Sequence, residues 1–140
     1  MQDYSRAANA FSQLAGILAG FSVAISVVFI TEIVSTSHPP DRDVPIALTL
    51  AASIAYVVSA GIFAGSTRWQ GVGIELPYRV GLVVFLFANV LAASTILVIC
   101  IQFGLIISSI VSGSMVIFAI AVLVVNLMAL YRGSQLRQRA

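Results

Sequence analysis

The sequence predicts an all-α protein: an integral membrane four-transmembrane-helix bundle with both termini in the cytoplasm. The first observation is composition, because 60% of the 140 residues are apolar and only 9% are charged. Soluble domains carry about 25% charged residues, and a soluble fold of this composition would expose a sticky apolar surface. Long uncharged runs and an uneven distribution of arginine are the other two observations. We expect a single transmembrane domain covering residues 1–140, with the lipid bilayer as its solvent.

The uncharged runs set the number of membrane crossings. Residues 7–31, 44–67 and 80–131 contain no Asp, Glu, Lys or Arg. A helix needs about 20 apolar residues to cross a hydrocarbon core of roughly 30 Å. The first two runs, of 25 and 24 residues, fit one crossing each, and the third, of 52 residues, fits two. The first run exceeds the roughly 7–15 residue apolar region of a signal peptide, so we expect it to stay in the protein.

Prolines, glycines and serines set the expected helix boundaries. Proline suits the first turn of a helix but not its interior. The Pro-Pro pair at 39–40 therefore ends the first helix, and Pro45 and Pro77 mark the starts of the second and third. Glycines and serines between 104 and 113 mark the last turn. We predict helices near 9–34, 45–66, 79–103 and 110–131.

Arginine predicts the orientation, since positive charge concentrates on the cytoplasmic side of membrane proteins. Six of the seven arginines fall on one side of a four-helix layout: Arg6, Arg68, Arg79, Arg132, Arg137 and Arg139. Only Arg42 falls on the other side. Four aromatic residues that an interfacial belt would hold lie near the arginine-rich side: Tyr4, Trp69, Tyr78 and Tyr131. We therefore expect both termini in the cytoplasm, and the protein in the plasma or inner membrane of the cell.

The segment between the first two helices concentrates acidic residues and the single histidine. His38, Asp41 and Asp43 offer imidazole and carboxylate ligands that a divalent ion accepts. Their spacing matches no established metal site, and Arg42 lies between the two aspartates. We interpret the segment as a solvated outer loop, with a metal or proton-sensing role as the alternative, and we expect no cofactor.

Small residues recur at helical spacing in all four predicted helices. Lipid gives helices no hydrophobic reason to associate, so close backbone approach and hydrogen bonds must hold them together. The expected packing positions are Gly16, Gly20, Gly61, Gly65, Ala88 and Ala119, within longer stripes that include Ser12, Ala24, Gly81, Ala92, Thr95 and Ser112. We expect these stripes to pack the four helices of one subunit, with contacts between subunits as the alternative.

Amides and a tyrosine are the polar groups placed deepest in the predicted spans. The candidates for lining a polar path are Tyr56, Asn89, Gln102 and Asn126, and Gln13 lies at a similar depth to Asn126. Such groups must face protein or water, and hydrogen bonds that fix helix register are their expected role. No ionised residue lies at mid-membrane, where proton-coupled transporters typically keep one.

Enzyme chemistry and nucleic-acid binding find little support. One histidine and one cysteine cannot supply paired haem ligands or thiol exchange, and a net charge of +2 is too small and dispersed for nucleic acid. Two functions are expected. The first is a protein that self-associates into an oligomer and forms or regulates a passive pore or channel. The alternative is an accessory subunit without activity of its own that packs against larger membrane proteins.

Overall fold

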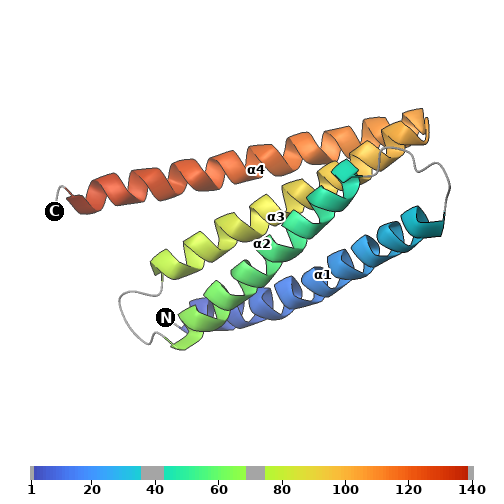
Figure 1. Ribbon diagram of the computed structural model, residues 1–140. Helices are drawn as coiled ribbons and strands as arrows, with labels where there is room; N and C mark the ends of the chain where they lie inside the picture. The colour runs from blue at the N-terminus through green and yellow to red at the C-terminus, as the bar shows by residue number, and fades with distance from the viewer. Residues whose placement is uncertain (1, 36–42, 69–74, 139–140) are drawn as a thin grey trace.

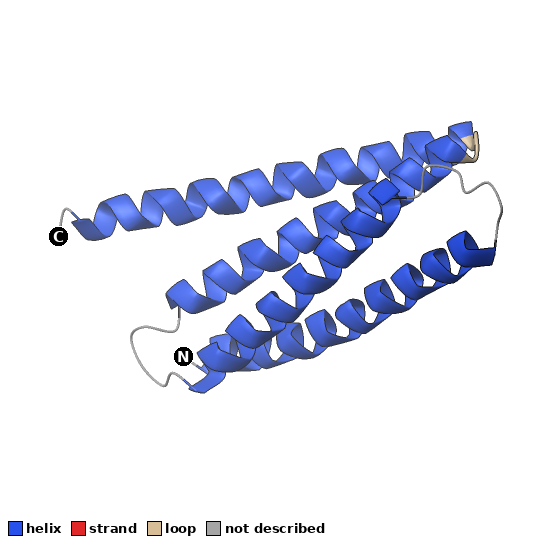
Figure 2. Cartoon of the chain, viewed as in Figure 1, coloured by secondary structure: helices blue, strands red, loops and turns tan. Residues whose placement is uncertain are grey.

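The computed structural model describes residues 2–35, 43–68 and 75–138, and this part of the chain is helical apart from a short turn (Figure 2). The helices are α1 (Gln2–Ser35), α2 (Asp43–Arg68), α3 (Glu75–Gln102) and α4 (Ile106–Gln138). Each contains a segment long and apolar enough to cross a membrane: Ser5–Val28, Asp43–Thr67, Glu75–Gln102 and Ile106–Ala129. The prediction of an all-α protein with four such helices is confirmed.

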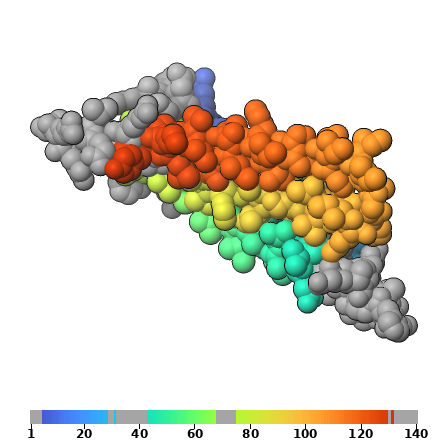
Figure 3. All heavy atoms as spheres, turned by 90° about the horizontal axis from the view of Figure 1, so that it is seen from above, coloured from blue at the N-terminus to red at the C-terminus, as the bar shows by residue number. Residues whose placement is uncertain are grey.

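The helices form an open arrangement in chain order, and successive helices are antiparallel (Figure 1). α1 packs mainly against α2, and α2 against α3, with a smaller contact between α1 and α3. α4 packs against α3 and against no other helix in the described part of the chain. Figure 3 shows the same order from above: α4 (orange) lies along α3 (yellow), and α2 (green) lies on the other side of α3. α1 and α4 are the two edges of the molecule, and the chain begins and ends at the same end of it (Figure 1).

All four helices extend beyond the predicted bounds, α2 by two residues at each end, because the prediction followed the apolar crossings. α1 begins at Gln2 rather than 9, and α4 ends at Gln138 rather than 131. α3 begins at Glu75 rather than 79. The Glu75 carboxylate lies in the first turn, where the helix dipole favours negative charge, and Pro77 is tolerated there because first-turn amides need no intrahelical partner.

The turn between α3 and α4 lies at Gly104, inside the predicted turn, but α4 begins at Ile106 rather than near 110. Gly104 has a φ of 67°, a left-handed conformation that glycine adopts without steric cost. Its amide donates to the Ile101 carbonyl over 3.0 Å and the Leu105 amide to the Cys100 carbonyl over 2.9 Å, a Schellman pair. The serines do not break α4, because Ser109 Oγ donates to the Leu105 carbonyl within the helical turn.

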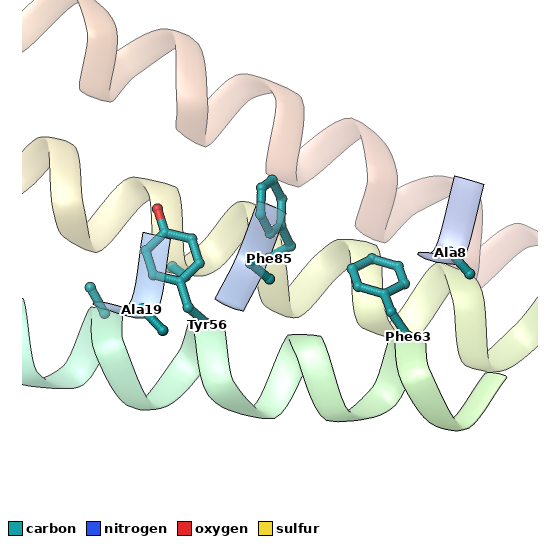
Figure 4. Packing of buried hydrophobic residues seen from close by; sticks show 8 residues of the cluster. Ala8, Ala19, Tyr56, Phe63 and Phe85 are labelled. Atoms are coloured by element: carbon teal, nitrogen blue, oxygen red, sulfur yellow. The ribbon is translucent and has the colours of Figure 1, made fainter. Parts of the chain in front are cut away.

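A core of small and aromatic residues joins α1, α2 and α3 (Figure 4). Its buried members are Ala8, Ala15, Ala19, Ala52, Tyr56, Phe63, Phe85 and Ala88. Phe11 of α1 ties the three helices together. Its ring stacks on Phe63 of α2, with centroids 5.4 Å apart, and meets Phe85 of α3 edge-on at 5.6 Å. The structure is thus a three-helix core with α4 added along one side.

Candidate functional site

A polar pair lies in the middle of the three-helix core. The Tyr56 hydroxyl of α2 donates to Asn89 Oδ1 of α3 over 3.1 Å. Asn89 Nδ2 in turn donates to the Phe85 carbonyl one turn earlier, over 2.8 Å. Tyr56 is only 2% exposed, and both residues lie near the centres of their candidate spans. The amide and the phenol therefore satisfy each other at the depth where hydrocarbon offers no other partner.

Two further hydrogen bonds connect neighbouring helices through serines. Ser59 Oγ of α2 donates to the Gly81 carbonyl of α3 over 3.1 Å. Ser12 Oγ of α1 donates to the Ala60 carbonyl of α2, also over 3.1 Å. With the Tyr56–Asn89 bond, these contacts fix the register of α2 against both neighbours, which is the role that the sequence predicts for the buried polar groups.

Five further buried hydroxyls bond to the backbone of their own helices. Ser26, Thr49, Ser53, Ser66 and Thr95 each donate to a carbonyl three or four residues earlier. Among the described residues, no buried side-chain nitrogen or oxygen lacks a hydrogen-bond partner. The buried polar side-chain atoms of the described three-helix core are therefore satisfied within the protein.

The four residues predicted to line a polar path do not share one path in this chain. Tyr56 and Asn89 meet, but they bond to each other inside the core. Gln102 is the exposed last residue of α3, at the end of its candidate span. Asn126 is half-buried on α4, and its Nδ2 donates to the Val122 carbonyl over 2.9 Å. A continuous path would need all four along one surface, and the structure divides them between the core and the periphery.

The predicted packing glycines of the first two helices are outside the core. A Cβ added at Gly16, Gly20, Gly61 or Gly65 would meet no atom within 4 Å in the described structure. The expectation that they pack helices of one subunit is therefore wrong. The four-residue spacing of the glycines was the basis for predicting these packing faces. In the structure, α1 contributes Ala8, Ala15 and Ala19 to the core, and they lie on a different face of the helix.

The predicted packing face of α3 lies in the core, and that of α4 meets α3. Ala88 is fully buried, and Gly81 and Thr95, seven residues to either side, are buried as well. Ala119 is half-buried on α4. At the far end of this contact Cys100 Sγ lies 3.8 Å from Ser112 Oγ. The seven-residue spacing is typical of helices that supercoil around each other.

The aromatic contacts were missed by sequence reasoning. The sequence pattern predicted no role for Phe11, Phe63 or Phe85, and Tyr78, expected at the membrane interface, packs edge-on against Phe11 at 6.3 Å. One signal was present, because the aromatic residues Tyr56 and Phe63 stand seven positions apart in α2. Small residues alternate with them at Ala52, Ser59 and Ser66. This alternation predicts a buried face that a search for glycine pairs does not detect.

The candidate metal residues are only partly described. Asp43 is exposed and begins α2, where a carboxylate favours the helix dipole. His38 and Asp41 lie outside the described residues. Within the described part of the chain, no group of three His, Cys, Asp or Glu side chains comes together.

Charge gathers at the ends of the helices. Arg79 Nη2 lies 2.6 Å from Glu75 Oε1 one turn away in α3. Both side chains are about two-fifths exposed, at 41% and 40%, so this ion pair adds little stability. Alternation of helix direction puts Arg6, Arg68 and Arg132 at the same end of the molecule as this pair.

The outer side of the α3–α4 hairpin carries a shallow apolar groove near the turn. It encloses about 410 Å³ and is lined by Leu97, Ile101, Gly104, Ile106, Ser109 and Ile110. The Ser109 hydroxyl is already bonded to the helix backbone, so the groove presents hydrocarbon and suits a lipid chain rather than a polar ligand. Compared with protein-family models, curated proteins and solved structures, the chain matches none of them.

Proposed function

We propose that this protein self-associates in a cell membrane, with both termini in the cytoplasm, and that the oligomer forms or regulates a passive pore. The proposed orientation rests on the arginine-rich end of the molecule, because Arg and Lys favour the cytoplasmic side. That end holds both ends of the chain (Figure 1). The proposed membrane is the plasma or inner membrane, and no catalytic activity, cofactor or nucleic-acid partner is proposed.

The open arrangement of the helices carries the proposal of self-association. Among the described helices, α4 contacts α3 alone, and only 6% of its candidate span is buried. Glycine pairs on α1 and α2 face outward with open space around them. Small outward faces are the positions at which membrane helices approach each other closely. A second copy of the chain is the partner that the proposal assigns to these faces.

The pathway in this proposal lies between copies and not within one. The buried polar side-chain atoms of the described three-helix core have hydrogen-bond partners within the protein. The Tyr56 hydroxyl and Asn89 Oδ1 bond to each other. Permeation is proposed as passive because the ionisable Asp, Glu and Arg residues of the described helices lie near helix ends. Coupled transport usually depends on an ionised group inside the membrane.

An accessory subunit is the second candidate. The observation that favours it is the same satisfied core, since a scaffold needs a rigid body with open faces and no internal route. The open faces of α1, α2 and α4 would then receive a larger membrane protein instead of another copy.

Two measurements on one preparation separate the candidates. Purified protein is reconstituted into lipid nanodiscs for particle mass and into liposomes for ion flux. A pore-forming oligomer gives several copies per particle and leaky liposomes. An accessory subunit gives one copy per particle and tight liposomes.

A further inference from the structure

Gln13 of α1 is an amide inside the candidate span, without a hydrogen-bond partner among the residues that the structure describes. It lies eight residues after Ser5, the start of that span, which is about 12 Å along a helix. Its side chain is exposed, and among the described residues it makes no hydrogen bond. An unpaired amide in hydrocarbon costs several kcal/mol. The single chain therefore leaves a polar group unsatisfied at a depth where neither water nor lipid tails can bond it.

The face around Gln13 is open to a close neighbour. Gly16 and Gly20 follow it at spacings of three and four residues, which puts all three on one side of the helix. A Cβ at either glycine would meet nothing within 4 Å. The Ser12–Ala60 hydrogen bond sets the register of the two antiparallel helices, so Gly16 is level with Tyr56 at the middle of the membrane. α2 packs on an adjoining side of α1 through Ala15 and Ala19, each about 100° around the helix from the glycine that follows it.

We propose that this face of α1, defined by Gln13, Gly16 and Gly20, is a contact with α1 of a second copy. A primary amide carries both a donor and an acceptor, so two Gln13 side chains satisfy each other across a two-fold axis, as in an isologous interface. A lipid tail offers neither group. The glycines let the two backbones approach closely enough for the short amide side chains to meet. The inference rests on the proposed self-association and names one of its contacts.

Cysteine crosslinking in native membranes tests the contact. In a Cys100→Ala background, Gly20→Cys is expected to form a disulfide-linked dimer on mild oxidation. Ile25→Cys is the matched control, because Ile25 is 47% exposed on the same helix but lies about 140° around it from Gly20. Gly61→Cys tests the outward glycine face of α2. A dimer at Ile25 or Gly61 without one at Gly20 overturns the proposed face and leaves self-association standing.

Loss of the amide tests the hydrogen bond. Gln13→Leu removes both hydrogen bonds of the pair and is expected to weaken dimerisation in lipid by at least about 3- to 30-fold, the range for one interhelical hydrogen bond, and Gln13→Asn to restore part of it. Both changes are outside the core, so thermal stability of the monomer should not change. Unchanged dimerisation of Gln13→Leu, with Gly20→Cys uncrosslinked, overturns the proposal. A monomeric wild-type protein in lipid overturns both this contact and the proposed function.

Discussion

The ring of Phe63 lies against the backbone of Gly81 so closely that a Cβ at residue 81 would be 3.0 Å from Phe63 Cε1. The same added Cβ would lie 3.1 Å from Ile62 Cγ2. Because Gly81 has no side chain, α2 and α3 approach there, and Ser59 reaches the Gly81 carbonyl. This close approach positions Tyr56 and Asn89, one to two turns farther along, for their own bond.

Gly81→Ala is therefore expected to destabilise the protein by about 1–3 kcal/mol, the usual cost of overpacking a closed contact. Gly61→Ala is the matched control. Its Cβ would meet nothing, and alanine is the better helix former by about 1 kcal/mol, so stability should hold or rise. Unfolding in mixed micelles measures both. Equal effects of the two substitutions would contradict the packing described for α2 and α3.

The Tyr56–Asn89 bond is expected to couple the two helices energetically. Tyr56→Phe and Asn89→Leu each remove it, and the double variant should cost less than the sum of the two. A double-mutant cycle should give a coupling of about 0.6–2 kcal/mol, the range for hydrogen bonds between membrane helices. Strict additivity would mean that the two side chains do not bond in the membrane.

The same Asn89→Leu variant separates a pathway inside the chain from one between copies. Asn89 is bonded within the core, so the substitution should leave liposome conductance per oligomer unchanged. A large loss of conductance, with the oligomer intact, would place the route through the core.

Orientation is expected to follow the arginines. In a Cys100→Ala background, Ser37→Cys should react with an impermeant thiol reagent in intact cells. Ser134→Cys should react only after lysis. Replacing Cys100, which is buried beside Ser112, removes the only native thiol. The reverse labelling pattern would contradict both cytoplasmic termini.

Arginine at one mouth of a pore is expected to bias conduction toward anions. Arg6 is exposed in the first turns of α1, and cationic groups at a pore mouth attract anions and repel cations. The bias should fade as ionic strength rises, because salt screens exposed charge. Reversal potentials in liposome-derived patches at low and high salt measure it, and cation preference at low salt would contradict this prediction.

The four membrane-crossing helices could be predicted from the sequence, but the sides on which they pack against each other could not. Uncharged runs report the bilayer directly, since burial of charge in lipid is costly whatever the neighbours are, so all four helices were expected. Which side of a helix meets which neighbour depends on tertiary packing. Gly16 and Ala15 are adjacent small residues, and only the position of α2 decides that Ala15 is buried and Gly16 is not.

The contact between Tyr56 and Asn89 also depends on helix packing that the sequence does not reveal. Tyr56 and Asn89 were expected as deep polar groups, but sequence could not show that they bond to each other, because their contact depends on the register that Gly81 and Ser59 set. The start of α4 was placed four residues too late for a local reason. Serines satisfy their hydroxyls within α4, so a serine-rich stretch that reads as a break in fact continues the helix.

Copy number in a lipid bilayer tests the central claim, self-association, most directly. The protein is labelled on a single cysteine at position 134 in the Cys100→Ala background, reconstituted at high lipid dilution, and counted by single-molecule photobleaching. Two or more bleaching steps per particle, persisting on dilution and reduced by Gln13→Leu, are the predicted result. Single-step bleaching of the labelled protein with Gln13 unchanged, at every protein-to-lipid ratio, would contradict self-association.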